Sequence, residues 1–377
     1  MADDHLARWR LLLGRHAEEE LDSELTREQL GMDRTLEALY DSDRSGGLGA
    51  SSPNVARWLG DIRTYFPSSV VKLMQQDALD RLDLRQMLLE PELLGQVEPD
   101  VHLVANLLTL SGVIPARTKQ TARQVVRKVV DELEKRLRQP TQQAVRGALQ
   151  RAQRTSRPRP HEIDWDRTIR KNLRHYSPAH QTVIAERLVG YARRRSALRD
   201  IVLCIDQSGS MASSVVYSSI FGSVLASLRS VSLRFVVFDT NVVDLSEHVR
   251  DPVELLFGTQ LGGGTDIAQA LGYCQQIIAR PAQTILVLIS DLFEGGDAAE
   301  LLLRAAELKK SGVNVACLLA LSDQGTPVYD HGHAQAFAEL GIPTFACTPD
   351  LFPEMMAAAI MRQDLSSWAA RHELASS

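Results

Sequence analysis

The sequence contains few cysteines, and no two of them are close together. The four are far apart and each lies in an apolar segment: Cys204, Cys274, Cys317 and Cys347. Without a Cys-x-x-Cys pair, a zinc knuckle or a thiol–disulfide redox centre has little support. We therefore expect buried, reduced thiols, as in a cytosolic protein.

Long hydrophobic runs are also missing. The longest apolar segments, such as TILVLI at residues 284–289, have the length of a strand and are much shorter than a membrane span. The first residues, MADDHLARWR, carry early acids and lack the apolar core of a signal peptide. These features predict a soluble, cytoplasmic protein with no membrane partner.

Positive charge is unevenly distributed, although the net charge is only −5. Residues 117–199 contain 22 Lys and Arg but 7 Asp and Glu, which leaves 20 basic and 40 acidic residues elsewhere. Such a segment suits either an acidic protein surface or a nucleic acid. Its aromatic residues are Trp165, Tyr176 and Tyr191. Because this offers no evident stacking platform, docking on acidic protein is favoured, and RNA binding by 117–199 is the alternative function.

Three regions of the chain differ in pattern. Residues 1–155 are predicted to be mainly α-helical, with the clearest period over residues 122–137. Residues 156–199 are predicted to be a basic linker and lead-in, because RTSRPRP at 154–160 combines prolines and arginines with almost no apolar residue. Residues 200–377 alternate between strand and helix patterns and form the third predicted domain.

This alternation predicts an α/β fold with a doubly wound, mostly parallel sheet and helices on both faces. The predicted strands are 201–205, 233–238, 284–290, 313–321 and 342–346, with a short edge strand at 241–245. The predicted helices are 215–228, 267–278, 298–310, 333–340 and one closing helix at 351–372. The apolar run at 284–289 is typical of a strand that is buried on both faces.

Oxygen-bearing side chains gather where these strands end. Asp206, Ser208 and Ser210 follow the first strand, Thr265 follows three glycines, and Asp291 follows the strand at 284–290. In an open parallel sheet, ligands bind beyond the carboxyl ends of the strands. Two carboxylates and three hydroxyls suit a hard cation, Mg²⁺ or Mn²⁺, rather than Zn²⁺. The set is too small to complete an octahedron, so one position is left for an acidic group of a partner.

These residues resemble the metal-ion-dependent adhesion site of von Willebrand factor type A (VWA) domains. The resemblance covers residues 200–377 and no motif residue is missing. It implies that Ser208, Ser210 and Thr265 touch the metal, while Asp206 and Asp291 bind mainly through water. The mode of action that it implies is protein binding, not catalysis.

The segment IDWDRTIRKNLRHY, with the arginine-rich stretch after it, is similar to intracellular bacterial CoxE-like proteins. CoxE-like proteins resemble partner proteins of MoxR-type AAA+ ATPases. This second resemblance implies an adaptor that joins the ATPase to a client protein, with an Asp or Glu of the partner bound to the metal.

Helix capping, hydrolysis and phosphate binding are other interpretations of these residues. Ser208 or Ser210 alone fits a helix N-cap. The sequence QSGSM is not the Gly-x-Ser-x-Gly of a serine hydrolase, and nothing marks His248 or His331 as its base. A phosphatase would need a second aspartate where Ser208 stands, and GGGTD lacks the lysine of a phosphate-binding loop. Asp266 is expected to cap its own helix, and Glu294 to be a solvated loop acid.

Overall fold

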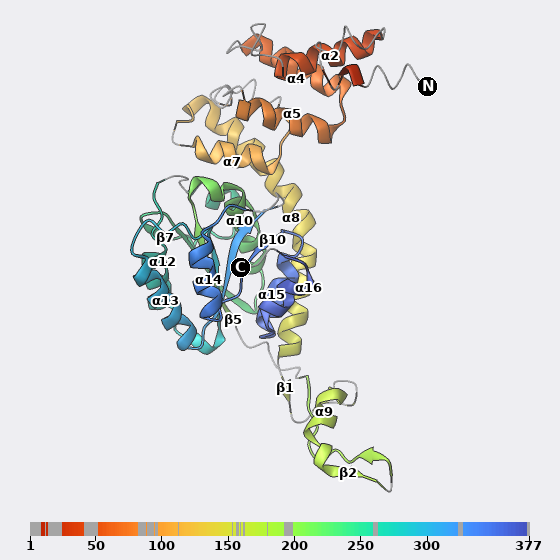
Figure 1. The fold of residues 1–377 in the computed structure, drawn as a ribbon, viewed down its shortest axis with the longest axis vertical. Helices are drawn as coiled ribbons and strands as arrows, with labels where there is room; N and C mark the ends of the chain where they lie inside the picture. Colours follow the sequence, from red (N-terminus) through yellow and green to blue (C-terminus); the bar gives the residue numbers. More distant parts are fainter. Residues whose placement is uncertain are drawn as a thin grey trace. The chain divides into compact units, whose positions relative to one another are not determined.

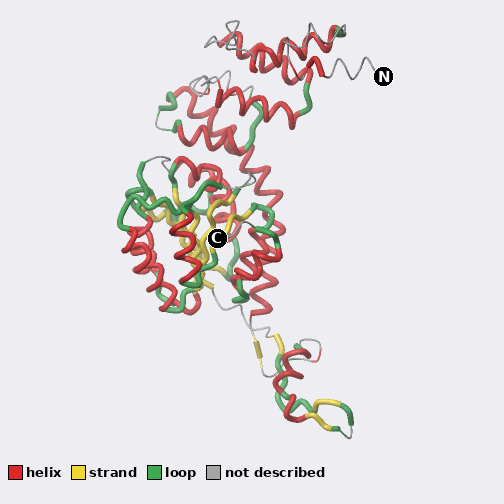
Figure 2. The backbone as a smooth tube through the Cα atoms, in the orientation of Figure 1, coloured by secondary structure: helices red, strands yellow, loops and turns green. Residues whose placement is uncertain are grey.

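The computed structural model describes residues 9–11, 13, 25–40, 52–81, 88, 94, 97–111, 113–152, 154–155, 158, 160, 163–178, 180–191, 199–258, 263–322 and 327–374. The chain divides into two compact units, Met1–Val129 and Val130–Ser377. Figure 2 shows that the described part of the first unit is helical, whereas the second combines helices and strands. The predicted boundaries at residues 155 and 199 stay a prediction.

The first unit is built from amphipathic helices. Its described helices are α2 (Arg27–Tyr40), α4 (Ser52–Tyr65), α5 (Ser68–Arg81), α7 (Val101–Thr109) and the first part of α8 (Ala116–Ala152). Asp100 begins α7 by accepting a hydrogen bond from Leu103 N at 2.7 Å, as an N-cap residue does. Trp58 and Ile62 of α4 are buried in the core. The mainly helical character predicted for this region is therefore confirmed for the described residues.

A small α/β module follows α8. It contains β1 (Arg154–Thr155), α9 (Trp165–Lys171), the 3₁₀ turn η4 (Leu173–His175), β2 (Tyr176–Ser177), β3 (Thr182–Val183) and β4 (Gly190–Tyr191). β2 pairs with β3, and β1 pairs with β4, both antiparallel. Figure 1 shows α9 and the β2 hairpin in lime green. Much of the segment predicted to be a linker therefore has regular structure of its own.

The main sheet has six strands in the order β10-β9-β8-β5-β6-β7. Their bounds are β5 (Arg199–Asp206), β6 (Val231–Phe238), β7 (Val242–Asp244), β8 (Thr284–Ile289), β9 (Asn314–Leu321) and β10 (Thr344–Cys347). All neighbouring pairs are parallel except β6 and β7, where β7 is a short antiparallel edge strand. The central strands β5 and β8 are buried along nearly their whole length. The predicted mostly parallel sheet is confirmed.

Helices cover both faces of this sheet. α12 (Ile267–Ile277), α13 (Ala298–Lys310) and α14 (His331–Glu339) share one core with alternate residues of β5, such as Val202 and Cys204. The intervening β5 residues are also buried and point to the other face. α10 (Ala212–Ala226) and α15 (Phe352–Ile360) pack together through Phe221 and Phe352, whose ring centroids lie 4.2 Å apart. Figure 1 shows the sheet between α12–α14 and α15–α16.

Helix α10 is apolar enough to be considered as a membrane span. By length and composition, the segment Gly209–Ala226 passes that test among the described residues, but 72% of it is buried inside the domain. A mostly buried segment of this kind fits a core helix. All four cysteines are also buried and free, as expected. Burial raises the pKa of the Cys317 and Cys347 thiols well above the usual range.

Two details of the C-terminal half differ from the prediction. The closing helix predicted at 351–372 is two helices, α15 and α16 (Leu365–Arg371). Arg362 lies between them with a φ of 53°, and Asp364 begins α16 by accepting from Ser366 N at 3.1 Å. A left-handed residue followed by a new N-cap ends one helix and starts another. The short helix α11 (Pro252–Gly258) was not predicted.

Candidate metal centre

Asp206 is the last residue of β5 and is fully buried. Its Oδ1 accepts a hydrogen bond from Ser208 N at 2.8 Å, and its Oδ2 accepts one from Ser290 Oγ at 2.8 Å. Burial raises the pKa of this carboxyl, and the hydrogen bonds from Ser208 and Ser290 oppose that effect. Asp206 is therefore held in one orientation by donors from two neighbouring strand ends.

Ser208 and Ser210 lie at the turn between β5 and α10. Ser208 Oγ is 3.2 Å from Ser210 Oγ, and Ser210 Oγ donates to Asp291 Oδ2 at 2.6 Å. Neither hydroxyl caps a helix: the Ser208 side chain makes no capping bond to the 3₁₀ turn η5 (Gly209–Met211), and the N-cap of α10 is Met211. The capping interpretation is wrong: the two hydroxyls contact each other, and that of Ser210 also donates to Asp291.

Asp291 reaches the same place from β8. Since β8 is the parallel neighbour of β5, both strands end at one edge of the sheet. Asp291 is buried, and besides Ser210 its side chain accepts a bond from Phe293 N at 3.4 Å. The next residue, Leu292, is fully buried and has a φ of 63°, an uncommon conformation for leucine. The chain thus turns sharply directly after Asp291.

The loop that carries Thr265 lies against the loop that follows Asp291. Gly295 N donates to the Thr265 carbonyl oxygen at 2.8 Å. A Cβ on Gly295 would be only 2.8 Å from the same oxygen, so this approach requires glycine. In the described part of the chain, no hydrogen bond joins the Thr265 hydroxyl to the other four side chains. The structure therefore connects Asp206, Ser208, Ser210 and Asp291 by hydrogen bonds, and links Thr265 to the loop after Asp291 through its backbone.

Ser290 is a member of this cluster that sequence reasoning did not identify. Its buried hydroxyl donates to Asp206 and accepts from Leu292 N at 3.1 Å. It therefore fixes the carboxylate of Asp206 and the turn that follows Asp291. A signal for it exists in the sequence, since Ser290 is the first hydroxyl after the five apolar residues ILVLI and directly precedes Asp291.

The two acids at the rim have different roles. Asp266 caps α12 as predicted, with Oδ1 accepting from Gln269 N at 2.7 Å. The interpretation of Glu294 as a solvated loop acid is wrong. It is half-buried, and its carboxylate accepts from Ile267 N at 2.9 Å and Gly296 N at 2.7 Å. Burial raises the pKa of Glu294. This side chain holds the start of α12 against the Asp291 loop.

The chemistry of these donors fits a hard divalent cation. The converging groups are carboxylate and hydroxyl oxygens, which Mg²⁺ and Mn²⁺ prefer. Among the described residues there is no cluster of three or more His, Cys, Asp or Glu side chains, the kind of set that Zn²⁺ favours.

The histidines weighed as bases of a hydrolase lie elsewhere. The ring of His331 packs against Tyr329 with centroids 4.2 Å apart and the ring planes tilted by 52°, and His248 is in the turn between β7 and α11. Within the described ranges, no histidine is hydrogen-bonded to Ser208 or Ser210, so the serines lack the contact that activates a nucleophile.

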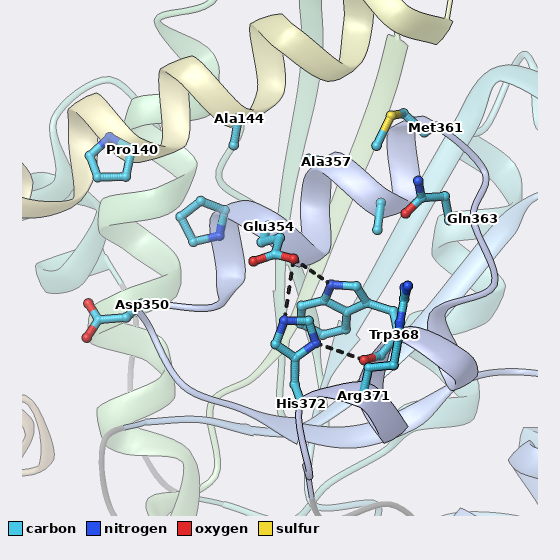
Figure 3. A pocket seen from close by; sticks show the side chains of 12 residues that line it. Pro140, Ala144, Asp350, Glu354, Ala357, Met361, Gln363, Trp368, Arg371 and His372 are labelled. Carbon is cyan, nitrogen blue, oxygen red and sulfur yellow. Dashed lines mark hydrogen bonds and ion pairs between the residues drawn. The ribbon is translucent and has the colours of Figure 1, made fainter. Parts of the chain in front are cut away.

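Apart from this cluster, a hollow of about 640 Å³ lies between α8, α15 and α16. Figure 3 shows that Glu354, Trp368 and His372 line it together. Glu354 Oε1 accepts from Trp368 Nε1 at 3.3 Å and is 3.4 Å from His372 Nε2, while His372 Nδ1 is 2.9 Å from the Trp368 carbonyl oxygen. Glu354, Trp368 and His372 therefore form a small network of their own at this hollow.

The strand-end cluster lies within a segment that matches a known protein family. The family model for VWA domain containing CoxE-like proteins matches residues 133–356. An Escherichia coli (strain K12) protein, described as "Uncharacterized protein YehP", is 36% identical over 354 residues, which is 91% of this chain and 93% of that protein.

Two solved structures are similar over 44% of this chain. One is an aerotolerance-related membrane protein from Bacteroides fragilis, 14% identical with a TM-score of 0.35, all of which is covered. The other is BatB from Bacteroides thetaiotaomicron, 13% identical with a TM-score of 0.32 and 98% covered. From the family match and the Escherichia coli relative, the chain belongs to the family of CoxE-like VWA-domain proteins.

Proposed function

We propose that this protein is a metal-dependent protein-binding adaptor and not an enzyme. Ser208, Ser210 and Thr265 would hold Mg²⁺ or Mn²⁺ directly, and Asp206 and Asp291 mainly through water. When bound, the ion supplies a coordination position for a carboxylate of another protein. The observation that carries the proposal is the continuous hydrogen-bonded set from Asp206 through Ser208 and Ser210 to Asp291, at the carboxyl edge of the sheet.

The contacts support separate roles for the two kinds of donor. Both oxygens of Asp206 already accept bonds from Ser208 N and Ser290 Oγ, which suits an indirect role. Ser210 Oγ lies within hydrogen-bond distance of Ser208 Oγ and of Asp291 Oδ2, so it is the centre of the cluster. The carboxylates supply negative charge and the hydroxyls supply close oxygen ligands.

The proposed partner provides an Asp or Glu side chain and is a cytoplasmic MoxR-type AAA+ ATPase, with which CoxE-like proteins are associated in general. In this proposal the chain joins the ATPase to a client protein that is matured or remodelled. Affinity for the partner then depends on the ion and on one acidic residue, because the ion alone bridges the two proteins at this point.

Metal binding is tested by isothermal titration of the full chain with MgCl₂. Asp206→Ala should weaken Mg²⁺ binding by about 100-fold or more, since it removes a buried charge and the anchor of the Ser208 backbone. Asp266→Ala is the matched control. It removes the cap of α12 and lowers stability, but should leave Mg²⁺ affinity within about threefold of the parent. Equal loss in both variants would contradict the assignment.

Partner binding is tested by co-purification with the MoxR-type ATPase from the same genome. Recovery should fall after chelation with EDTA and should return when Mg²⁺ is restored. The Asp206→Ala chain should recover little ATPase in either condition. If recovery is unchanged by EDTA and by Asp206→Ala while Mg²⁺ binding itself is confirmed, the ion has another role than bridging.

A further inference from the structure

The α/β module at residues 163–191 exposes large apolar side chains. Five side chains between residues 165 and 184 are 43–59% exposed: Trp165, Ile169, Leu173, Tyr176 and Ile184. They are a third of the 15 exposed large hydrophobic residues in the described part of the chain. Single exposed apolar residues are normal, but a concentration of this kind marks an interaction surface.

Three of these residues lie on one face of a helix. Trp165 and Ile169 are in α9 and Leu173 follows in η4, so they are spaced at i, i+4 and i+8. We call this set the α9 stripe. α9 ends at Lys171 with Asn172 as its C-cap, and Leu173 begins η4 directly afterwards. The stripe is therefore an exposed apolar ridge that runs along α9 and into the turn that follows it.

The module does not use this ridge for its own packing. α9 is instead fastened by buried polar side chains. Thr168 Oγ1 donates to the Val189 carbonyl oxygen at 3.1 Å and accepts from Val189 N at 3.0 Å. Asn172 Nδ2 donates to the Arg187 carbonyl oxygen at 2.8 Å, and its Oδ1 accepts from Arg187 N at 3.1 Å. Folding therefore leaves the apolar residues of α9 outside.

The charges beside the stripe favour an acidic partner. Residues 163–191 contain five Lys and Arg against three Asp and Glu. Two of the acids are engaged, since Asp164 caps α9 and Glu186 pairs with Arg174 at 3.6 Å. Among the described residues, Arg170 and Lys171 in the last turn of α9 are exposed and have no ion-pair partner. A partner with carboxylates beside its apolar residues would neutralise them.

We propose that the α9 stripe docks an amphipathic helix of another protein, with apolar residues at i and i+4 and with Asp or Glu along its flank. A second copy of this chain fits less well, because a twofold contact would bring two surfaces with an excess of positive charge together. Nucleic acid fits less well because Ile169 and Leu173 cannot stack on bases. A membrane fits less well because α9 has only 7 residues and carries Asp166.

The test uses the full chain and a labelled synthetic helix that has leucines at i, i+4 and i+8 and glutamates beside them. Fluorescence anisotropy should detect saturable binding that weakens with added salt. Leu173→Ser should reduce affinity about tenfold, the loss expected for one buried leucine. Leu303→Ser on α13 is the matched control, because Leu173 and Leu303 are both 58% exposed, and it should leave affinity unchanged.

Several outcomes would overturn the proposal. These are no binding of the glutamate helix up to about 1 mM, equal binding of a lysine version, or equal losses in Leu173→Ser and Leu303→Ser. Tighter, Leu173-dependent binding of oligouridine or of phosphatidylglycerol vesicles would assign the stripe to RNA or to a membrane. A dimer seen by light scattering in the parent and lost in Leu173→Ser would assign it to a second copy.

Discussion

The two regions that carry our proposals depart from the usual distribution of side chains in opposite directions. At the carboxyl edge of the main sheet, Asp206, Ser290 and Asp291 are polar yet buried. In the module at 163–191, Trp165 and Leu173 are apolar yet more than half exposed. Buried polar groups must be satisfied inside the protein, whereas exposed apolar groups gain only when something covers them.

This difference shows in the contacts. The buried cluster forms a closed set in which each carboxylate has at least two hydrogen bonds. The apolar side chains of the α9 stripe are not needed to hold α9 in place, because Thr168 and Asn172 already do so. We infer that the first region is organised before a ligand arrives and that the second depends on an external surface.

The largest stability effect is expected at Ser290. Ser290→Ala removes the donor to Asp206 Oδ2 and leaves a buried carboxylate oxygen without that partner. The free energy of unfolding, measured by urea denaturation in EDTA, should fall by about 2 kcal/mol. This result would confirm that the polar cluster itself stabilises the sheet edge.

Ser219→Ala provides the control for that comparison. Ser219 is equally buried, but its hydroxyl bonds to the carbonyl oxygen of Val215 in its own helix at 2.8 Å. That carbonyl keeps its place in the helix without the serine, so the change should stay within about 0.5 kcal/mol. Similar losses at Ser219 and Ser290 would remove any special role of the cluster.

A smaller effect is expected in the module. Thr168→Val retains the shape of the side chain but removes the hydroxyl that bonds to both backbone groups of Val189. Hydrogen exchange of the Val189 amide should become about tenfold faster, equivalent to about 1.4 kcal/mol. Thr141→Val is the control, since Thr141 bonds to the Leu137 carbonyl oxygen of its own helix. Unchanged exchange in Thr168→Val would mean that the α9 stripe, and not the polar face, holds the module.

The smallest effect is expected at Asp244, at the half-exposed edge of the sheet. Partial burial raises the pKa of Asp244, but hydrogen bonds from Ser246 and Tyr273 outweigh it, so the folded pKa is below the ordinary value of 3.8. A depressed folded pKa adds stability above pH 3.8 that is lost as the pH falls through the folded value. Asp244→Asn should therefore cost about 1 kcal/mol at pH 7.

Thermal unfolding as a function of pH checks this prediction. The difference in melting temperature between Asp244→Asn and the parent should be largest at neutral pH and should shrink below pH 3.8. A difference that stays constant over the whole range would show that the charge of Asp244 does not matter and that the loss of an acceptor oxygen accounts for the effect.

The sequence predicted the main sheet well because its strands have a strong local signal. Buried parallel strands are continuous apolar runs, and the predicted strands at 284–290 and 201–205 lie within a residue or two of the observed bounds. Four of the five predicted site residues are joined by hydrogen bonds in the structure.

Other features have no such local signal. The separation of α15 from α16 depends on one residue, Arg362, in a left-handed conformation. The role of Glu294 depends on a contact with Ile267 N, 27 residues away in the chain. The structure of the module at 163–191 depends on bonds from Thr168 and Asn172 to a segment 14 to 21 residues later. Long-range polar contacts of this kind cannot be inferred from periodicity.

The buried, left-handed Leu292 has a consequence for the choice of ion. Its side chain is anchored in the core and its carbonyl oxygen is 3.0 Å from His333 Nδ1, so the turn beside Asp291 is fixed on both sides. A rigid turn cannot expand to fit a larger radius. Discrimination between divalent cations depends on cavity size and ligand flexibility, so we predict that the proposed site binds the small Mg²⁺ ion in preference to the larger Ca²⁺.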